Sequence, residues 1–458
     1  MRNSHLRNFV PALFASLALF PAVRADELSE LKAQLQALEQ KILVLERKQE
    51  IKDEAAITAA PTAPRITVSD KGYTLASPDA ANSLRIRGLV QLDHRLFFDD
   101  GSSVQNNSFV LRRARIIVEG VLGKQFSYQI VPEFGGANPA LVDANFTWTL
   151  SPELGFKFGR FKAPVGLELL QSDSWTFFNE RSVVSALVPN RDLGIVAQGD
   201  LLGGKLNYSA GIIGGVADGA NTTNSDFDNE KELVGRVFAT PFKDKAGSPV
   251  QGLGFGIAGT YGRAKGTNGR AAAYRTDGQQ PVFTYLASTI TDGPNWRITP
   301  QLEYRNGPFG LLSEYVISTI NVRPSTTGKL SELQNKAWQV SAGYVLTGEN
   351  SSYNGVVPAH DFNLSKGTWG AFEVAARYAN LQLDHSAFPL FANPVTNISE
   401  SNGFGLGLNW YLSKAVRFTF DYYQTEFERF ATATPTPTTN PVLQQDEKTF
   451  ISRFQIAF

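Results

Sequence analysis

The last nine residues of the chain alternate strictly between the two faces of a β-strand and stop on an aromatic residue. Phe450, Ser452, Phe454, Ile456 and Phe458 share one face, and the intervening residues share the other. An apolar strand at a chain end presents an unpaired edge, and in water such an edge invites aggregation. A barrel that closes in lipid pairs this edge and gives the apolar face a compatible environment. The ending therefore predicts a membrane barrel, on the condition that the rest of the chain supplies an even number of similar strands.

Composition narrows the class of protein without deciding it. No internal run of about 20 apolar residues occurs, so a helical membrane protein is excluded. Lys+Arg and Asp+Glu are equal at 43 each, so the net charge gives no case for nucleic acid as a partner. Cysteine is absent, which fits an envelope protein without disulfides. The 32 Phe, 14 Tyr and 6 Trp suit the aromatic girdles of a membrane barrel, but a soluble β-sandwich would show similar numbers, so the pattern must decide.

Residues 1–25 form a predicted secretory signal peptide. Arg2 and Arg7 give a basic start, an apolar stretch follows, and small residues precede a cleavage site after Ala25. A membrane anchor is the alternative, but the apolar stretch is short and contains two prolines. We therefore expect export, with the barrel residing in the lipid of a Gram-negative outer membrane.

Residues 26–54 carry the heptad pattern of a coiled-coil helix. Apolar positions recur at alternating spacings of three and four residues: Leu28, Leu31, Leu35, Leu38, Ile42 and Leu45. Charged residues at the flanking positions can pair between chains, as Glu27 can with Lys32. An amphipathic helix on the barrel or the membrane is the alternative, although it would usually carry a wider apolar stripe. Residues 55–83 are then expected to form a linker stiffened by proline.

Residues 84–458 are predicted to form an all-β transmembrane barrel of about 16 antiparallel strands. The predicted strands cover residues 84–98, 108–121, 124–134, 140–150, 153–162, 193–201, 204–214, 232–242, 252–264, 295–306, 308–320, 335–347, 368–382, 402–413, 415–427 and 447–458. Their connections alternate between short and long, which matches short periplasmic turns and longer external loops. The long connections, interpreted as external, include 265–294, 321–334, 348–367 and 428–446.

The two faces of these strands differ as they do in a barrel with a water-filled lumen. Within residues 296–305, every second residue is apolar or aromatic, and those between them are polar or charged. A β-sandwich alternates as well, but its packed core would refuse charges. The polar face here carries many charges, so a water-filled lumen is the better interpretation.

Several stretches together resemble the phosphate-selective porin O and P family. These stretches are Phe109–Arg115, Gly159–Phe161, Gly343–Glu349, Trp369–Glu373 and Gly407–Tyr411, and they follow the order of the family across nearly the whole predicted barrel. The resemblance implies a sixteen-stranded outer-membrane barrel, usually a homotrimer, that passes small anions. The predicted coiled coil is an addition to this barrel and fits trimer formation.

Strand alternation turns a set of basic residues toward the lumen. The predicted pore-lining and anion-binding residues are Arg85, Arg87, Arg113, Arg115, Lys157, Arg236, Arg297, Arg305 and Arg377. The four in the first two strands could form a ladder that draws anions inward, since guanidinium groups bind phosphate-like oxygens with matched forks. Arg112 breaks the alternation and is predicted to mark a strand end. Inward-facing acids are nearly as numerous, so position matters more than the total charge.

Residues 163–192 form a long connection after the fifth strand, where a porin loop folds inward and narrows the channel. The candidate constriction residues are Asp173, Glu180, Arg181, Arg191 and Asp192. The alternative is that these charges tie the loop to the barrel wall. Phosphate-selecting members of the family carry lysines at positions that correspond to Leu169 and Ser174, and Asp173 would repel a dianion. We therefore hypothesise that phosphate selectivity is weakened or lost.

Two other functions are less well supported by the sequence than an anion channel. An enzyme would need a catalytic pair, but the mature chain offers only His94, His360 and His385, without a Gly-x-Ser-x-Gly elbow at a strand end. We expect no catalytic residues, no metal and no cofactor. The second competitor is a general diffusion porin whose coiled coil mainly tethers the outer membrane to the cell wall or to another partner.

Overall fold

The computed structural model describes residues 25–59, 63–98, 107–136, 138–223, 228–267, 273–430 and 446–458, with the side chains of 25–28, 54–59 and 267 left out. The predicted signal peptide, apart from Ala25, lies outside the described residues. The chain divides into two compact units, residues 1–64 and residues 65–458.

The first unit contains one helix, α1 (Ala25–Ala59). Its apolar seam is exposed along the described side chains: Leu31, Leu35, Leu38, Ile42 and Leu45. A helix is therefore present where the heptads predict one, whereas the coiled-coil pairing stays a prediction. None of the helices in the described residues is both long and apolar enough to cross a membrane.

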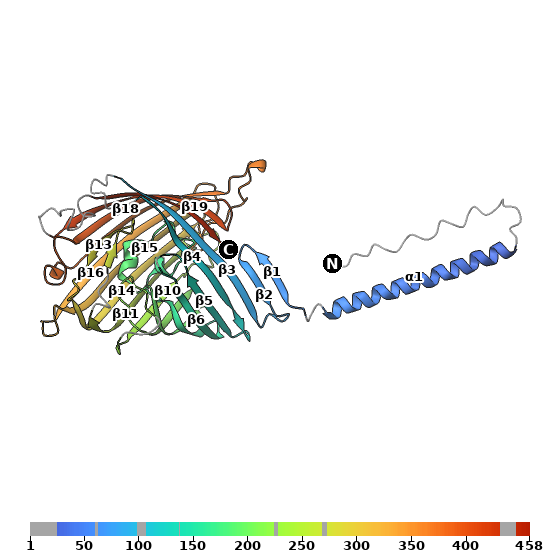
Figure 1. Cartoon of the computed structure of the whole chain (residues 1–458), viewed down its shortest axis with the longest axis horizontal. Coiled ribbons are helices and arrows are strands. Elements are labelled where there is room, and N and C mark those ends of the chain that lie inside the picture. Colours follow the sequence, from blue (N-terminus) through green and yellow to red (C-terminus); the bar gives the residue numbers. More distant parts are fainter. Residues whose placement is uncertain are drawn as a thin grey trace. The chain divides into compact units, whose positions relative to one another are not determined.

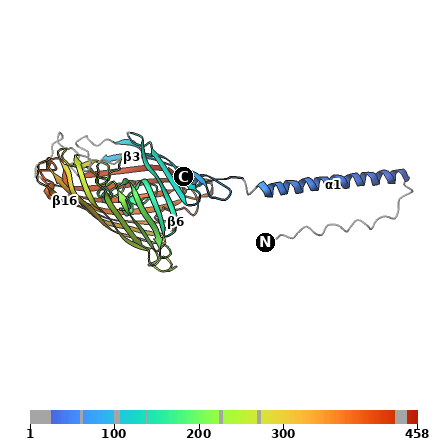
Figure 2. The same cartoon turned by 90° about the horizontal axis from the view of Figure 1, so that it is seen from below.

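The second unit is a closed barrel of sixteen antiparallel strands, which confirms the predicted fold class (Figures 1 and 2). The barrel strands are β3 (Ser83–Phe98), β4 (Ser108–Leu122), β5 (Phe126–Glu133), β6 (Ala140–Ser151), β7 (Leu154–Lys162), β8 (Arg191–Leu201), β9 (Leu206–Ile213), β10 (Glu232–Ala239), β11 (Leu253–Thr267), β14 (Ile290–Asn306), β15 (Phe309–Arg323), β16 (Ser331–Val345), β17 (Ala371–Gln382), β18 (Ile398–Tyr411), β19 (Val416–Arg429) and β20 (Glu447–Ala457). The barrel closes where β20 pairs with β3 along Lys448–Ala457, so no strand edge of the barrel wall is left open there.

The terminal aromatic residue is fixed to the first barrel strand. The Phe458 N–H donates to the Gly88 carbonyl at 3.1 Å, and the Gly88 N–H donates to the Phe458 carbonyl at 2.9 Å. A Cβ at position 88 would lie 2.7 Å from the Phe458 ring, so glycine leaves room for it. Tyr73 packs edge-on against the same ring, with centroids 5.9 Å apart.

A short hairpin precedes the barrel where we expected only a linker over residues 55–83. It consists of β1 (Arg65–Ser69) and β2 (Gly72–Ala76), and β2 pairs with the start of β3. Gly72 has a φ of +99°, which suits the tight turn between the two strands. The hairpin was missed because each strand is only five residues long, too short for a clear alternation signal.

The connection at residues 346–370 lies at the end of the barrel opposite to the one we predicted. Strands run alternately up and down, so this connection between β16 and β17 falls at the same end as the short turns and Phe458. It includes the short helix η2 (Leu364–Lys366). The interpretation of 348–367 as an external loop is therefore wrong, because length was weighed above the parity of the strands. The predicted loop at 428–446 lies largely outside the described residues.

Arg112 lies within β4 and not at a strand end, which corrects the prediction for this residue. The register between β3 and β4 shifts next to Gln91, so Arg112 is left without a residue opposite it. Such a bulge adds one residue to a strand and re-aims its side chains. As a result Arg112 and Arg113 both reach the lumen.

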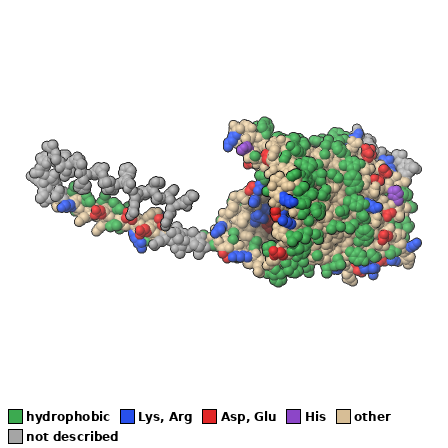
Figure 3. Space-filling view, turned by 180° about the vertical axis from the view of Figure 1, so that it is seen from behind, with side chains coloured by type: hydrophobic (Ala, Val, Ile, Leu, Met, Phe, Trp, Pro, Cys, Tyr) green, Lys and Arg blue, Asp and Glu red, His purple; other side chains and the backbone are tan. Residues whose placement is uncertain are grey.

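The outer face of the barrel is apolar and the inner face is polar, as the alternation predicts. Ile298 and Leu302 are exposed on the outer face of β14, whereas Arg297, Thr299 and Gln301 are buried on the inner face. Figure 3 shows hydrophobic side chains over the barrel wall, with charged side chains gathered toward its ends. This belt matches the hydrocarbon layer of a membrane.

Loops fill much of the inside next to β14–β18. A hairpin of β12 (Ala273–Arg275) and β13 (Pro281–Thr284) packs in an apolar cluster with the short helix η3 (His385–Ala387). Asn335 Nδ2 donates to the hydroxyls of Tyr274 and Tyr285, both at 3.1 Å. This side of the lumen is therefore packed, and open space remains toward β3–β10.

Candidate pore constriction

Residues 163–190 leave β7 and fold into the lumen, and the last two residues of the predicted loop, 191 and 192, already belong to β8. That the loop narrows the channel stays a prediction. The loop contains a single helical turn, α2 (Leu167–Leu170), and the short helix η1 (Val183–Leu187). The backbone N–H groups of Leu167 and Glu168 both donate to the Glu314 carboxylate on β15, the second at 2.9 Å. These bonds fix the start of α2 to the opposite wall of the barrel. They also satisfy backbone N–H groups that the first turn of a helix leaves without partners.

The tip of the loop is held by side chains of the last barrel strands. Arg417 Nη1 donates to the Thr176 carbonyl at 3.0 Å, and Asn409 Nδ2 donates to the Phe177 carbonyl at 2.8 Å. Asn179 Nδ2 in turn donates to a carbonyl of β20 at 3.1 Å. Buried backbone groups must find partners, so these bonds give the loop one defined path across the lumen.

Asp173 lies at the centre of a basic group, here named the Asp173 cluster, which consists of Asp173, Arg113, Arg115 and Arg181. Arg113 Nη2 lies 3.3 Å from the carboxylate, and Arg115 and Arg181 also form ion pairs with it. Burial alone would raise the pKa of the Asp173 carboxyl, but the three guanidinium groups outweigh it and hold the pKa well below its usual range.

Glu180 forms a second group, the Glu180 cluster, with Arg95, Arg112 and Arg453. The guanidinium groups lie 3.3, 2.7 and 3.0 Å from Glu180 Oε1, in that order. Burial would raise the pKa of the Glu180 carboxyl, but Arg112 above all holds it below its usual range.

The two clusters together hold more arginines than carboxylates. Six arginines, Arg95, Arg112, Arg113, Arg115, Arg181 and Arg453, pair with four carboxylates, Asp93, Glu133, Asp173 and Glu180. The two clusters, with their direct ion-pair partners, therefore carry a positive net charge, in contrast to the neutral chain as a whole.

The Asp173 cluster lies between two open spaces. A cavity of about 580 Å³ on the side of Phe458 is lined by Arg115 and Asp173, among others. A cavity of about 390 Å³ on the other side is lined by Arg113 and Arg181. A position between two cavities is the one expected for residues that narrow a channel.

Comparison with known families identifies this barrel. The chain matches the family described as phosphate-selective porin O and P over residues 84–446, a range that begins within β3 and ends just before β20. The chain belongs to this family. It is accordingly a porin of the outer membrane. Porin O of Pseudomonas aeruginosa is 24% identical over 425 residues, which cover 84% of this chain and 91% of Porin O.

Solved structures agree on the fold of this porin. OmpT of Vibrio cholerae, in its trimer form, shares 12% identity and superposes with a TM-score of 0.52, covering 82% of this chain and all of that chain. The outer membrane channel DcaP of Acinetobacter baumannii shares 10% identity with the same TM-score, covering 83% of this chain and 98% of that chain.

Within the porin, Leu169 and Ser174 are both buried, and they line different cavities: Leu169 the one of about 390 Å³ and Ser174 the one of about 580 Å³. An ammonium group nevertheless lies nearby, because Lys162 on β7 donates from Nζ to the carbonyls of Leu169 and Gln171, each at 2.8 Å. Sequence reasoning missed Lys162 because its role depends on the path of the loop.

The predicted arginine ladder divides into two parts. Arg113 and Arg115 belong to the Asp173 cluster, while Arg85 and Arg87 share the carboxylate of Glu119 closer to the barrel end. Arg87 forms a bidentate pair, at 3.0 Å from Nε and 2.9 Å from Nη2. Two cations on one carboxylate leave this end of the ladder positive.

Three further predicted pore-lining arginines face inward but anchor loops. Arg297 is buried against Asp218 and Glu232, the latter at 2.8 Å. Arg377 is buried too, and its Nη1 donates to the Glu180 carbonyl at 2.9 Å.

Arg305 pairs with Glu303 at 3.0 Å and donates to Ser351 at 2.8 Å. Together with Arg297 and Arg377, it lies behind loop segments, so these three residues are less accessible to a solute than the Asp173 cluster.

The two predicted residues at the end of the constriction loop have structural partners. Arg191 lies 3.1 Å from Asp143 on β6, while Asp192 accepts backbone N–H groups from Gly215 and Val216. Both residues therefore brace the neighbouring segments around the vestibule, as the tying alternative proposed.

The connection at residues 346–370 adds a support that the sequence did not indicate. Tyr353 Oη donates to the Leu167 carbonyl at 2.5 Å, and Gln171 Nε2 donates to the Tyr353 carbonyl at 2.8 Å. The connection therefore supports α2 from the end of the barrel at which the short turns lie. Counting the strands would have placed this connection at the correct end of the barrel, but nothing in its sequence indicates that Tyr353 contacts α2.

Proposed function

We propose that this porin passes small anions by passive diffusion along the wall of β4–β8 and past the Asp173 cluster. The observation that carries the proposal is the excess of arginines over carboxylates where the lumen narrows. Fixed positive charge in a narrow, water-filled passage raises the local concentration of anions and lowers that of cations. The description of the family as phosphate-selective supports an anionic solute.

The sign of the zero-current potential across a planar bilayer with a KCl gradient tests this proposal. We expect a potential that corresponds to chloride as the more permeant ion. A potential of the opposite sign would overturn the proposal. The same measurement with the charge-reversal variant Arg115→Glu should shift the potential toward potassium, whereas Lys124→Gln, on an exposed turn, should leave it unchanged.

Within this function, we propose that selectivity for phosphate over other anions is weak. The arginines of the Asp173 cluster already bond a carboxylate, and the loop positions 169 and 174 supply no ammonium group of their own. Asp173 itself repels anions little, because three arginines share its charge. Titration of the chloride conductance with phosphate tests this point: block only at millimolar phosphate is expected, and block at micromolar phosphate would contradict it.

We further propose that the porin is a homotrimer whose α1 helices associate through the exposed leucine seam. The trimer form of the Vibrio cholerae relative supports the first part, and the heptads support the second. Residues 1–25 direct export and are removed after Ala25, which the mass of the mature protein can test.

Deletion of residues 26–64 separates this proposal from a tether to the cell wall. If α1 assembles the trimer, the variant should lose heat-resistant oligomers and keep its unit conductance, because the barrel is a separate compact unit. Oligomers that persist while the protein no longer sediments with the cell wall would favour the tether.

A further inference from the structure

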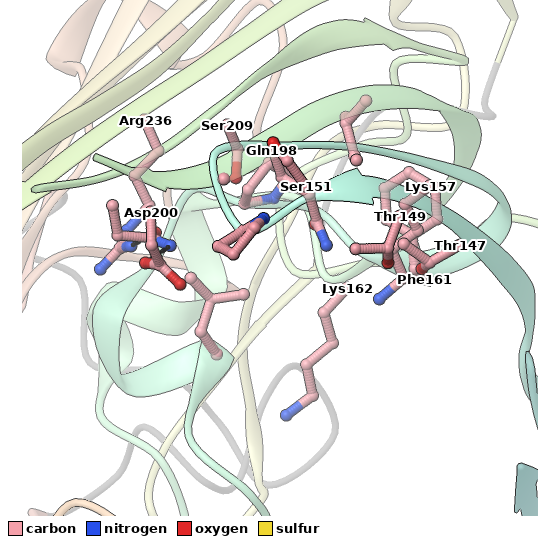
Figure 4. A pocket seen from close by; sticks show the side chains of 17 residues that line it. Thr147, Thr149, Ser151, Lys157, Phe161, Lys162, Gln198, Asp200, Ser209 and Arg236 are labelled. Atoms are coloured by element: carbon pink, nitrogen blue, oxygen red, sulfur yellow. Dashed lines mark hydrogen bonds between the residues drawn. The ribbon is translucent and has the colours of Figure 1, made fainter. Parts of the chain in front are cut away.

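The inner wall of β6–β10 carries a cavity that the constriction does not account for. It has a volume of about 430 Å³, a size typical of sites for small organic molecules. Hydroxyl and amide side chains line it: Thr147, Thr149, Ser151, Gln198, Asn207 and Ser209. Figure 4 shows Lys157 toward one end, Arg236 and Asp200 toward the other, and Gln198 and Ser209 between them.

Lys157 and Arg236 differ from the arginines of the constriction because neither pairs with a carboxylate. Across the described ranges, Lys157 has neither an ion pair nor a hydrogen bond, and its Nζ lies 5.3 Å from the centroid of the Phe161 ring. Arg236 bonds only neutral partners, Gln301 at 3.1 Å and Asn207 at 3.3 Å. A partly buried cation without a directly bonded carboxylate is available to a solute anion.

The strand register fixes the separation of these two cations. Across the strands, Arg236 pairs with Ser209, Ser209 with Gln198, and Gln198 with Gly155 on β7. Lys157 lies two residues further along β7 than Gly155. Three strand spacings and two residue rises place the two Cα atoms about 16 Å apart. In Figure 4 the two side chains remain at opposite ends of the cavity. An inorganic anion can contact one of them, whereas an elongated organic anion can contact both ends of the wall.

The two ends of the cavity differ in chemistry. At the Lys157 end, Lys162 also faces the cavity and no carboxylate lines it in the described residues. At the other end, Asp200 accepts a hydrogen bond from Asn207 Nδ2 at 3.1 Å, next to Arg236. A carboxylate beside amides and a guanidinium offers both donors and acceptors, which is what vicinal hydroxyl groups need.

We propose that this cavity is a binding subsite for polyhydroxylated organic anions, such as sugar phosphates or sugar acids. The anionic group lies at Lys157 and Lys162, and the hydroxyl groups lie along Gln198 and Asn207 toward Asp200. This inference rests on the proposed function as an anion channel and names a class of solute for it. The subsite holds such a solute beside the constriction and raises its local concentration there.

Block of the chloride conductance in planar bilayers tests the subsite, with glucose 6-phosphate, inorganic phosphate and glucose as probes. We expect glucose 6-phosphate to give half-maximal block at a concentration at least ten-fold lower than either of the other two. Equal block by glucose 6-phosphate and inorganic phosphate would overturn the inference, because the hydroxyl-binding wall would then contribute nothing.

Two variants assign the two ends of the subsite. Lys157→Gln should weaken the block by glucose 6-phosphate at least five-fold, and Asn207→Ala should weaken it at least three-fold while leaving the block by inorganic phosphate unchanged. Lys124→Gln removes one positive charge from an exposed turn and is the matched control. Circular dichroism before and after heating shows that each variant is a folded barrel. Unchanged block in both folded variants would overturn the inference.

The outcome is distinguishable from a failure of the proposed function. Chloride-selective current without preference for glucose 6-phosphate rejects the subsite alone. Potassium-selective current rejects both.

Discussion

The guanidinium of Arg113 lies 3.3 Å from the carboxylate of Asp173, and two more arginines, Arg115 and Arg181, bond the same carboxylate. These ion pairs change the role that we assign to Asp173 in the constriction loop. Asp173 was expected to repel anions, but it is the residue around which the wall and the loop gather their positive charge. Its role is to hold the loop, and the surplus charge belongs to the arginines.

Asp173→Asn should destabilise the barrel and increase its preference for anions. The change leaves one buried and two largely buried guanidinium groups without their shared counter-charge, and loss of one partner from a buried ion pair costs about 3–5 kcal/mol. Denaturant unfolding followed by tryptophan fluorescence measures the loss. Asp244→Asn, which removes a carboxylate from the exposed pair with Lys205, is the control and should cause no measurable loss. Equal stability of the two variants would contradict the anchoring role.

The contribution of Asp173 should depend on pH in a defined window. Because the pKa of this carboxyl is lower in the folded than in the unfolded chain, its contribution is complete above the unfolded value of about 4 and is lost as the pH falls through the folded value. The difference in unfolding free energy between the wild type and Asp173→Asn should therefore stay constant from pH 7 to about pH 4 and shrink below it. A difference that already shrinks near pH 6 would show that the carboxyl is not held by the arginines.

Gly159 should tolerate no side chain, in contrast to Gly235 on the same barrel wall. Gly159 has a φ of +108°, and a Cβ there would overlap with the carbonyl oxygen of Ala144, whereas a Cβ at Gly235 would meet no atom within 4 Å. Backbone strain of this kind costs about 1–3 kcal/mol, and the overlap adds to it. Gly159→Ala should lower the denaturation midpoint clearly and Gly235→Ala should not. Similar midpoints would mean that the wall relaxes around position 159.

Tyr353→Phe should loosen the constriction loop without unfolding the barrel. The variant removes the bond from the hydroxyl to the Leu167 carbonyl, and a buried acceptor without its donor costs about 1–3 kcal/mol. Single-channel recordings should show more frequent current fluctuations. Tyr304→Phe removes a similar hydroxyl bond on the exposed face, to the Pro249 carbonyl, and should leave the recordings unchanged. Recordings from Tyr353→Phe without additional fluctuations would show that the bond from Tyr353 does not hold the loop in place.

The sequence was sufficient for the barrel because a membrane strand must alternate with period two. The predicted strand at 193–201 ends where β8 ends, and the alternation in 296–305 assigns inner and outer faces correctly. Counting the strands would also have placed the connection at 346–370 at the correct end of the barrel, because antiparallel strands alternate in direction. Its length suggested an external loop instead. By contrast, the break in alternation at Arg112 is visible in the sequence, but a bulge and a strand end give the same signal.

The partners inside the lumen could not be predicted, since they depend on the paths of the loops. Alternation turns Arg113 and Arg297 inward alike, but only the folded loops decide that Arg113 lies at the constriction and that Arg297 is buried against Asp218. The tie between Lys162 and the Leu169 carbonyl joins two positions seven residues apart through a turn that no periodicity describes.

The central claim is that anions pass along the wall of β4–β8, beside Lys157 and the constriction loop. The chain has no cysteine, so Lys157→Cys provides a single site for methanethiosulfonate reagents during a bilayer recording. An anionic reagent should reduce the chloride conductance and shift the zero-current potential toward potassium, while a cationic reagent should restore both toward the wild-type values. Ile298→Cys, on the outer face of β14, should respond to neither reagent. An unchanged conductance and potential after complete modification at position 157 would contradict the account.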